Sequence, residues 1–363
     1  MSGGLAELHE KARAVLDPVH YDYYAGGVGD EVVLGENEAA FGRLALLPRV
    51  LRGRVTRGLG VELPGGRLAA PVLVAPTAFH RLAHPEGERA TARAAAAAGT
   101  VLVSGMASTV AIGDVVRAAR EVASDAAVWF QLYLQPDEAV TEALVRRAER
   151  AGCTALVVTV DSPVFGRHRR DAEHGFHDLP EGLAAENMRD LPGCPPGGVR
   201  DIEMSPALSW AHLDRLRGLT SLPLWLKGVL HPADAVLAVE HGAAGVVVSN
   251  HGGRQSDLAP AAVEALPAVV DAVAGRVPVL LDGGVRGGGD VAVALALGAA
   301  AVGVGRPVLW GLAAAGEAGV ARVLDVLRDE FDHALALCGG RDVGDLTRDL
   351  VVTRGTGVTA RCG

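Results

Sequence analysis

The sequence predicts an α/β protein in which eight parallel strands close into a barrel, with an N-terminal helical extension and a long loop after the fourth strand. From about residue 71 onward, short apolar runs alternate with longer amphipathic segments, which is typical of parallel strands joined by crossover helices. About eight such units are present, the number that closes a (β/α)8 TIM barrel. The main alternative is an open doubly wound sheet, but its usual G-x-G-x-x-G turn is absent.

The barrel is expected over residues 71–340. Its strands are predicted at 71–76, 101–104, 128–133, 155–160, 224–227, 245–250, 277–282 and 301–305. The clearest helices are the alanine-rich run 85–98, the run 136–151 with charges on one face, and the run 232–241, which begins at a proline and stops before Gly242. We interpret these helices as scaffold without chemistry.

Two regions exceed this repeat. Residues 1–70 precede the first barrel strand as an extension, and the polar segment 166–206 separates strands four and five. A structureless insertion of that length inside a compact domain is usually a lid or binding loop, or else disordered. No linker divides the chain, so residues 1–363 are predicted to form a single domain.

Composition limits the function. The 363 residues are 49% hydrophobic and carry 34 basic against 43 acidic side chains, a net charge of -9, which argues against a nucleic-acid binder. No apolar stretch is long enough to cross a bilayer, and the N-terminus lacks the order of a signal peptide. The four cysteines, Cys153, Cys194, Cys338 and Cys362, are not spaced for a metal site or a redox pair, so we expect reduced thiols in a cytoplasmic enzyme.

In such a barrel, the C-terminal strand ends supply the working groups. The last two strands end in Asp282-Gly283-Gly284-Val285-Arg286 and Gly305-Arg306-Pro307, each followed at once by a helix. Glycines let backbone N–H groups approach an anion, and a helix N-terminus favours negative charge. One such turn is weak evidence because tight turns need glycine anyway, but two on adjacent strands predict a phosphate site.

Lys227 ends strand five in a chain with only one other lysine, Lys11. A compact ammonium at this position, where the chain elsewhere uses arginine, indicates a need for a point charge. The plain alternative is a lysine that extends from a strand end into solvent. A flavin beside it would favour the first interpretation, because a nearby cation stabilises the charge of the reduced ring.

His251 follows strand six, precedes two glycines and lies three residues before Arg254. A proton acceptor and a carboxylate-binding cation can therefore share one loop. Asp161, at the end of strand four, is a candidate to orient the imidazole. Most histidines are structural, and an aspartate at a strand end is about as often a helix cap, so both assignments depend on their setting.

These residues form a recognisable pattern. The run Ser249-Asn250-His251-Gly252-Gly253-Arg254-Gln255, together with the two glycine turns, resembles the FMN-dependent 2-hydroxy acid oxidases and dehydrogenases, the group of glycolate oxidase, lactate oxidase, mandelate dehydrogenase and hydroxymandelate oxidase. Further matches are Tyr21-Asp22-Tyr23-Tyr24-Ala25, Ala75-Pro76-Thr77-Ala78, Ala83-His84-Pro85-Glu86-Gly87-Glu88, Gln131-Leu132-Tyr133, Thr159-Val160-Asp161 and Leu226-Lys227-Gly228-Val229. The likeness covers essentially the whole chain.

The resemblance implies a role for each matching residue. His251 is the catalytic base with Asp161 as its partner, Arg254 holds the substrate carboxylate, and Tyr23 and Tyr133 bind the carboxylate and hydroxyl. Lys227 lies at the N1/C2 carbonyl edge of the flavin. The other cofactor contacts implied are Ser104, Gln131, Thr159 and the backbone around Thr77 and Ala78 at the ring, Asp282 at the ribityl chain, and Gly284, Arg286, Gly305 and Arg306 at the phosphate. Ser249 is also expected to bind the cofactor.

Two departures concern the substrate. Similar enzymes have Gly-Arg-Arg after strand four, and the second arginine joins Arg254 on the carboxylate, whereas this chain has His168 there. A neutral imidazole replaces a bidentate fork, so carboxylate binding should weaken unless His168 is protonated or a neighbouring arginine substitutes. Glycolate oxidase also has a bulky aromatic after strand two, whereas this chain has Gly105-Met106-Ala107, which makes room for a larger substrate unless Phe79 or Phe165 fills the space.

The sequence therefore predicts FMN-dependent oxidation of a 2-hydroxy acid, large or aromatic, to the 2-oxo acid, with O₂ as the acceptor that yields H₂O₂. The alternatives are an FMN barrel whose substrate lacks a simple carboxylate, a non-redox flavin isomerase or lyase, and a barrel that only binds ligand. The resemblance also implies a homo-oligomer, a tetramer or an octamer. No metal site is predicted.

Overall fold

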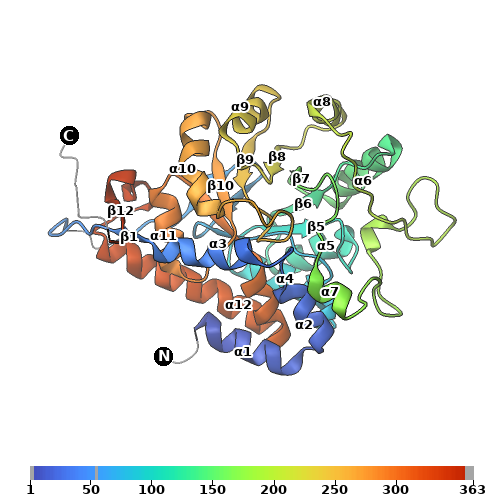
Figure 1. Ribbon diagram of the computed structural model, residues 1–363, viewed down its shortest axis with the longest axis horizontal. Helices are drawn as coiled ribbons and strands as arrows, with labels where there is room; N and C mark the ends of the chain where they lie inside the picture. The colour runs from blue at the N-terminus through green and yellow to red at the C-terminus, as the bar shows by residue number, and fades with distance from the viewer. Residues whose placement is uncertain (1–3, 54–55, 356–363) are drawn as a thin grey trace.

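The predicted strands form a closed parallel barrel in the computed structural model, which describes residues 4–53 and 56–355 (Figure 1). The strands follow one another around it in the order β10-β11-β4-β5-β6-β7-β8-β9. Their bounds are Val72–Val74 (β4), Leu102–Gly105 (β5), Val128–Leu132 (β6), Ala155–Thr159 (β7), Leu224–Lys227 (β8), Gly245–Val248 (β9), Val279–Asp282 (β10) and Ala301–Val304 (β11). The (β/α)8 prediction is confirmed. Strand β4 is shorter than expected, since Pro71 and Pro76 have no N–H to donate to the ladder.

Helices cover the outside of the barrel. They are α4 (Gly87–Ala97), α5 (Ile112–Val122), α6 (Glu138–Ala151), α8 (Trp210–Leu219), α9 (Pro232–Glu240), α10 (Ala262–Val273), α11 (Gly288–Ala296) and α12 (Arg306–Leu337). Helix α6 is capped by Asp137, whose side chain accepts a hydrogen bond from Ala139 N at 3.0 Å. Helix α9 starts at Pro232 and is followed by Gly242 with φ +75°, as its sequence predicts. Because both faces of the strands are covered, the strands are buried and almost wholly apolar up to their last residues.

A β-hairpin closes the N-terminal end of the barrel. Strands β2 (Val61–Leu63) and β3 (Gly66–Leu68) pair antiparallel, and the turn between them presents two backbone carbonyls to the barrel interior. Gly65 O accepts from Trp129 Nε1 at 2.9 Å, and Pro64 O accepts from Trp225 Nε1 at 3.0 Å. The two indoles stack with centroids 4.9 Å apart and are fully buried. This packing leaves the C-terminal end of the barrel as the place for a ligand.

The rest of the extension supplies helices α1 (Leu5–Val15), α2 (Pro18–Ala25) and α3 (Val32–Gly42) (Figure 1). Helices α1 and α2 pack against α12, and α3 packs against α10. Buried side chains join α1 and α2 to the start of α12, including Ala12, Tyr24 and Trp310. A short strand β1 (Leu44–Leu46) then pairs antiparallel with β12 (Val351–Thr353). The extension therefore carries Tyr23 to the mouth.

The segment 166–206 is not structureless. It contains helix α7 (Arg169–Glu173), the 3-10 turn Glu186–Met188, and a bridge between Arg189 and Val199. Asn187 is fully buried, and its side chain accepts from Ile112 N at 2.8 Å. This second half is thus tied to the body of the barrel, while α7 lies against α2.

Among the described residues, no helix combines the length and apolarity that crossing a membrane requires. Cys153, Cys194 and Cys338 are free thiols, and burial raises the pKa of Cys153 to about 12. Cys362 lies outside the described residues.

Candidate active site

A cavity of about 370 Å³ opens at the C-terminal mouth of the barrel. Most of the residues singled out by sequence line it: Tyr23, Thr77, Ala78, Gln131, Tyr133, Thr159, His168, Lys227, His251, Arg254, Asp282, Gly284, Arg286, Gly305 and Arg306. Ser104, Asp161 and Ser249 lie behind this lining, where they contact other polar groups. Strand ends far apart in the chain therefore meet at one place.

His251 and Asp161 form a hydrogen-bonded pair. The distance from His251 Nδ1 to Asp161 Oδ1 is 2.9 Å, and Ser162 Oγ donates to the same oxygen at 3.0 Å. Burial alone would raise the pKa of Asp161, but the charge and hydrogen bond of His251, together with Lys227 and Ser162, lower it to about 2. The carboxylate is therefore ionised and accepts the Nδ1 proton, which leaves Nε2 as the ring atom for proton transfer.

The loop that carries His251 has an unusual backbone. His251 has φ +60°, and Gly252 and Gly253 continue with φ +62° and +76°. A left-handed conformation is costly for a side chain with a Cβ, so the surrounding contacts must hold it. One of them is the hydrogen bond from His251 N to Ser249 Oγ at 3.0 Å. This turn directs the imidazole across the cavity.

Tyr133 faces the free side of the imidazole. Its hydroxyl lies 3.4 Å from His251 Nε2, and the two rings are nearly parallel at 5°. Burial, with the charge of Asp161, raises the pKa of Tyr133 well above its usual range, and burial also raises the pKa of Tyr23. Both phenols therefore stay protonated and can donate to a substrate oxygen.

Lys227 is almost completely buried at the end of β8. Its Nζ donates to Ser249 Oγ at 3.0 Å and lies 3.4 Å from Asp282 Oδ2. A buried ammonium paired with Asp282 is the kind of point charge that the sequence indicated. The snorkelling alternative is wrong, because the side chain is only 5% exposed.

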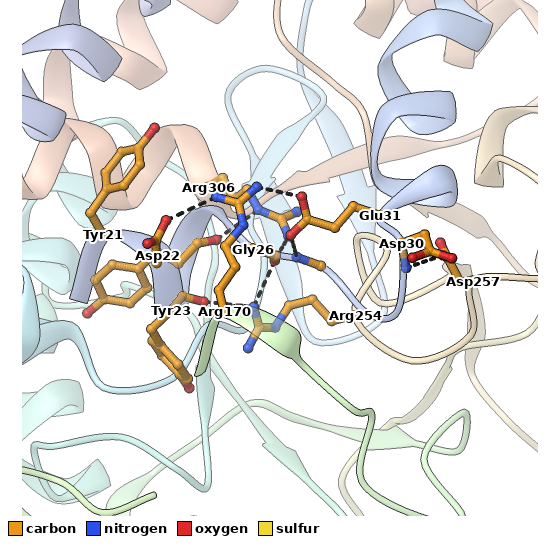
Figure 2. Close-up of polar contacts among 12 residues, drawn as sticks. Tyr21, Asp22, Tyr23, Gly26, Asp30, Glu31, Arg170, Arg254, Asp257 and Arg306 are labelled. Atoms are coloured by element: carbon orange, nitrogen blue, oxygen red, sulfur yellow. Dashed lines mark hydrogen bonds and ion pairs between the residues drawn. The ribbon is translucent and has the colours of Figure 1, made fainter. Parts of the chain in front are cut away.

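Arg254 is held at one end and open at the other. Its Nη1 donates to Tyr23 O at 2.8 Å and to Gly26 O at 3.0 Å, and the guanidinium lies 5.1 Å from the centre of the Tyr23 ring (Figure 2). Within the described part of the chain, Nε and Nη2 make no hydrogen bond. They form a fork that a carboxylate fits.

The guanidinium groups of Arg306 and Arg286 are both held by acceptors of the protein. Arg306 donates to Tyr24 O at 2.9 Å, Gly252 O at 2.8 Å and Gly26 O at 2.7 Å, one bond from each nitrogen. Arg286 Nη2 pairs with Glu38 Oε1 at 2.7 Å. Burial, with the nearby charges of Arg254 and Arg286, lowers the pKa of Arg306 to about 9. This end of the cavity has an excess of positive charge that a bound anion would relieve.

The glycines of the last two strand ends bring backbone close to this charge. Gly283 and Gly284 have φ +96° and +85°, and a Cβ on Gly284 would lie 1.9 Å from Asn37 O. Helix α12 begins at Arg306; Pro307 has no N–H, and Val308 N and Leu309 N donate to Gly305 O, so within the described residues the first turn leaves the N–H of Arg306 as its backbone donor. Backbone donors and a helix N-terminus are the features of a phosphate site.

Two buried carboxylate oxygens in the described residues, Asp161 Oδ2 and Asp282 Oδ1, have no hydrogen-bond partner. Leaving such an acceptor unpaired costs free energy. Asp282 lines the cavity between Lys227 and the glycine turns, and a hydroxyl donor there would satisfy its free oxygen. A polyhydroxylated chain that ends in a phosphate, such as that of FMN, therefore fits the residues present.

The remaining predicted cofactor contacts are linked to one another. Gln131 Nε2 donates to Thr159 Oγ1 at 3.0 Å, and Ser104 Oγ lies 3.1 Å from Ser108 Oγ. Thr77 Oγ1 lies 2.6 Å from Nε2 of the buried His80. These contacts fix the polar atoms at the ends of β4, β5, β6 and β7.

His168 lines the cavity, but its nitrogens face protein acceptors. Nε2 lies 3.0 Å from Arg254 O, and Nδ1 lies 3.1 Å from Asp171 Oδ2. The neighbouring Arg167, Arg169 and Arg170 are not among the lining residues, so none of them replaces the missing fork.

Sequence reasoning did not assign several apolar lining residues. Ile202, Met204 and Leu309 line the cavity, as do Phe79 and Phe165, which were considered only as space fillers. Gly105 and Ala107 line it too. Ile202, Met204 and Phe165 come from a loop, where no periodicity marks which side chains point inward.

We call the glycine turns and arginines at the ends of β10 and β11 (Gly283, Gly284, Arg286, Gly305 and Arg306) the anion cradle. The anion cradle and the unpaired Asp282 oxygen define a class: barrel enzymes that hold a phosphorylated cofactor across the mouth of the barrel. The chain matches the FMN-dependent dehydrogenase family over residues 12–353 and belongs to that family. It is an oxidoreductase, and FMN is its cofactor.

The chain is similar to a peroxisomal (S)-2-hydroxy-acid oxidase of Oryza sativa subsp. japonica, 46% identical over 354 residues, or 96% of this chain and 95% of the relative. It is also similar to an L-lactate oxidase of Nostoc sp., 46% identical over 94% of this chain and 96% of the relative. A solved structure of a mandelate oxidase mutant with (S)-mandelic acid has a TM-score of 0.88 and 43% identity and covers 98% of this chain and 99% of that one.

Proposed function

We propose that this FMN-dependent dehydrogenase oxidises a 2-hydroxy acid, preferably one with a large or aromatic side chain, to the 2-oxo acid. The observation that carries the proposal is that the His251–Asp161 pair and the open fork of Arg254 line one cavity. A base and a carboxylate site at opposite ends of one substrate fit an α-carbon that bears both a hydroxyl and a carboxylate. The names of the relatives, all 2-hydroxy acid oxidases, support the same substrate class.

The proposed division of work follows from the contacts. His251 Nε2 takes the proton from the substrate, and ionised Asp161 stabilises the imidazolium through Nδ1. Tyr133 donates to the substrate hydroxyl oxygen, whereas Tyr23 and the free nitrogens of Arg254 bind the carboxylate. Bound FMN supplies the acceptor for the two electrons that leave the substrate carbon.

Lys227 is proposed to stabilise negative charge on the flavin ring, and Asp282 to accept from a ribityl hydroxyl. The phosphate is assigned to the backbone around Gly284, Gly305 and Arg306. Their donors add to the positive charge of Arg286 and Arg306 even though both guanidinium groups are already hydrogen-bonded to protein. The backbone around Thr77 and Ala78 and the polar side chains of Ser104, Gln131 and Thr159 are assigned to the ring, with Ser249 acting through Lys227.

The preference for a large side chain rests on the walls of the cavity. Gly105 and Ala107 leave space at the end of β5, and Phe79 and Phe165 offer aromatic surfaces. Aromatic side chains favour an aromatic partner by offset or edge contacts.

The test is anaerobic mixing of the yellow protein with lactate, glycolate and (S)-mandelate while the visible flavin band is recorded. The proposal expects bleaching by at least one acid and fastest bleaching by mandelate. A flavin that none of these acids bleaches would refute the proposed activity. Admitting air should restore the band and release one H₂O₂ per turnover if O₂ is the acceptor.

A second candidate is the oxidation of a 2-hydroxy compound that lacks a free carboxylate, such as an ester or an amide. The contacts of His168 favour it, because both ring nitrogens already face protein acceptors. Among the described residues, Arg254 is then the one guanidinium fork for a carboxylate at a place where similar enzymes have two arginines. Mandelamide in the same experiment distinguishes the two candidates: it should bleach the flavin faster than mandelate only if the second is right. A non-redox isomerase or lyase would show no bleaching with either compound.

We further propose that residues 1–363 work as one unit in the cytoplasm, as a homotetramer. The free thiols of Cys153, Cys194 and Cys338 suit a reducing compartment. Mass photometry of the yellow protein tests the oligomer: a tetramer is expected, an octamer is the alternative that the resemblance also implies, and a monomer would refute the proposal.

A further inference from the structure

The segment from Asp22 to Glu31 carries Tyr23 to the cavity although it belongs to no barrel strand. Its backbone carbonyls are bound by two arginines of the barrel, Arg254 and Arg306, and its side chains are bound by a third, Arg170 of helix α7. Figure 2 shows the guanidinium of Arg170 between the carboxylates of Asp22 and Glu31. The two ends of the segment are thus joined through one side chain from the loop after strand β7.

These contacts are close and partly shielded from solvent. Arg170 Nη1 lies 3.1 Å from Asp22 Oδ1, and Nη2 lies 2.5 Å from Glu31 Oε2. The three side chains are 34%, 28% and 25% exposed. The hydrogen bond to Glu31 raises the pKa of Arg170. Burial opposes ionisation of Asp22, but its bonds with His174 and Arg170 keep its pKa below the usual range.

Arg170 also touches the backbone that orients Arg254. A Cβ on Gly26 would lie 3.3 Å from Arg170 Cδ, so the stem of Arg170 packs on Gly26. Gly26 O accepts from both Arg254 Nη1 and Arg306 Nη2. Glu31 Oε1 accepts from Gly27 N at 3.0 Å, and Glu31 itself has φ +62°, a conformation that needs support. The ion pairs of Arg170 therefore hold the same backbone segment that carries Tyr23 and orients Arg254, the two residues proposed to bind the substrate carboxylate.

We propose that Arg170 is a positioning residue for the substrate carboxylate: by clamping Asp22 and Glu31 it holds the segment so that Tyr23 and the Arg254 fork converge. This inference rests on the proposed function, and it names residues of the extension and of loop 166–206 as part of one binding unit. Arg170 touches neither substrate nor cofactor, since it does not line the cavity. Its effect passes through the carbonyls of Tyr23 and Gly26.

The same helix provides a matched control. Arg169, one residue earlier, pairs with Asp30 of the same segment, but those side chains are 66% and 67% exposed. An exposed ion pair contributes little, because water and salt screen it. Arg169→Met removes the same charge and a similar volume without disturbing the clamp.

The experiment titrates phenylglyoxylate, the 2-oxo acid that oxidation of mandelate would give, into four FMN-loaded proteins while the flavin absorbance is followed. The proteins are wild type, Arg170→Met, Arg170→Lys and Arg169→Met. We expect Arg170→Met to raise the Kd of phenylglyoxylate roughly tenfold, because a small misplacement of a binding group weakens binding. KM should rise in parallel, and kcat and the FMN dissociation constant should stay near wild type. Arg170→Lys should recover part of the loss, and Arg169→Met should match wild type.

A double variant makes the test specific. If the clamp acts through Asp22, the double variant Asp22→Asn/Arg170→Met should raise the Kd of phenylglyoxylate by less than the product of the two single-variant increases. Equal affinities in Arg170→Met and Arg169→Met overturn the proposal. So does a parallel loss of FMN affinity and kcat, which indicates general disruption. Failure of the proposed function is a separate result: no 2-hydroxy acid would bleach the flavin of the wild-type protein. The titrations would still compare the Kd of phenylglyoxylate between the Arg170 and Arg169 variants.

Discussion

The His251–Asp161 pair makes the sharpest prediction about catalysis. The pKa of Asp161 lies at about 2 rather than 3.8, although burial pushes it upward, so the attraction of His251, Lys227 and Ser162 outweighs the cost of burial. The difference corresponds to about 2 kcal/mol in favour of the ionised carboxylate. Asp161→Asn keeps the shape and removes this charge. Lys227 and Ser162 contribute to this figure and burial opposes it, so we assign the imidazolium a loss on the order of 1–2 kcal/mol, which slows the reaction roughly five- to thirtyfold.

The assay is anaerobic stopped-flow bleaching of the flavin at pH 7 with a saturating 2-hydroxy acid. Asp214→Asn is a matched control, because Asp214 Oδ1 lies 2.6 Å from His241 Nδ1 in a second His–Asp pair outside the cavity. It should bleach at the wild-type rate. If Asp161→Asn bleaches within about threefold of wild type, the carboxylate does not assist proton transfer and the reasoning fails.

The remaining predictions concern the rest of the site. His251→Ala should stay yellow but lose at least about a hundredfold in bleaching rate, the usual contribution of a general base; normal bleaching would remove His251 from that role. Lys227→Met should weaken both FMN retention and bleaching, because it leaves Asp282 buried without its cation, and equilibrium dialysis of FMN measures the first effect. His168→Arg should lower the Kd for phenylglyoxylate but not for mandelamide, since only the carboxylate gains a fork; equal changes for both ligands would contradict this. Ionised Asp161 should stabilise the fold above pH 3.8, and this contribution should disappear as the pH falls toward 2, so urea midpoints of wild type and Asp161→Asn should converge there.

The barrel strands and most of the cavity lining were predictable because both follow from local rules. A parallel strand buried on both faces must be apolar, so Val128–Leu132 and Gly245–Val248 are legible as sequence. In a closed barrel, all strand ends meet at one rim, so Lys227, His251 and Asp282 had to converge once the strands were located.

The use of the arginines was not predictable in the same way. Arg286 and Arg306 follow glycine turns beside a helix start, which favours phosphate as their partner, and that assignment stays a prediction. The sequence does not show that their guanidinium groups also bind Glu38 and the carbonyls of Tyr24, Gly26 and Gly252. Those partners belong to the extension or to another loop. Pairings across such separations depend on how the extension docks, and spacing within one motif contains no information about that.

The extension is therefore part of the binding site. The barrel alone supplies the base, the buried cation and the anion cradle, but Arg254 and Arg306 point their donors at carbonyls of residues 23–26. Without those carbonyls, Arg254 would lose both acceptors of its Nη1 and Arg306 would keep only Gly252 O, and unpaired donors on these half-buried side chains are costly. Docking of the extension thus satisfies the arginines and brings in Tyr23 in the same event, so the carboxylate site forms only when the extension is in place.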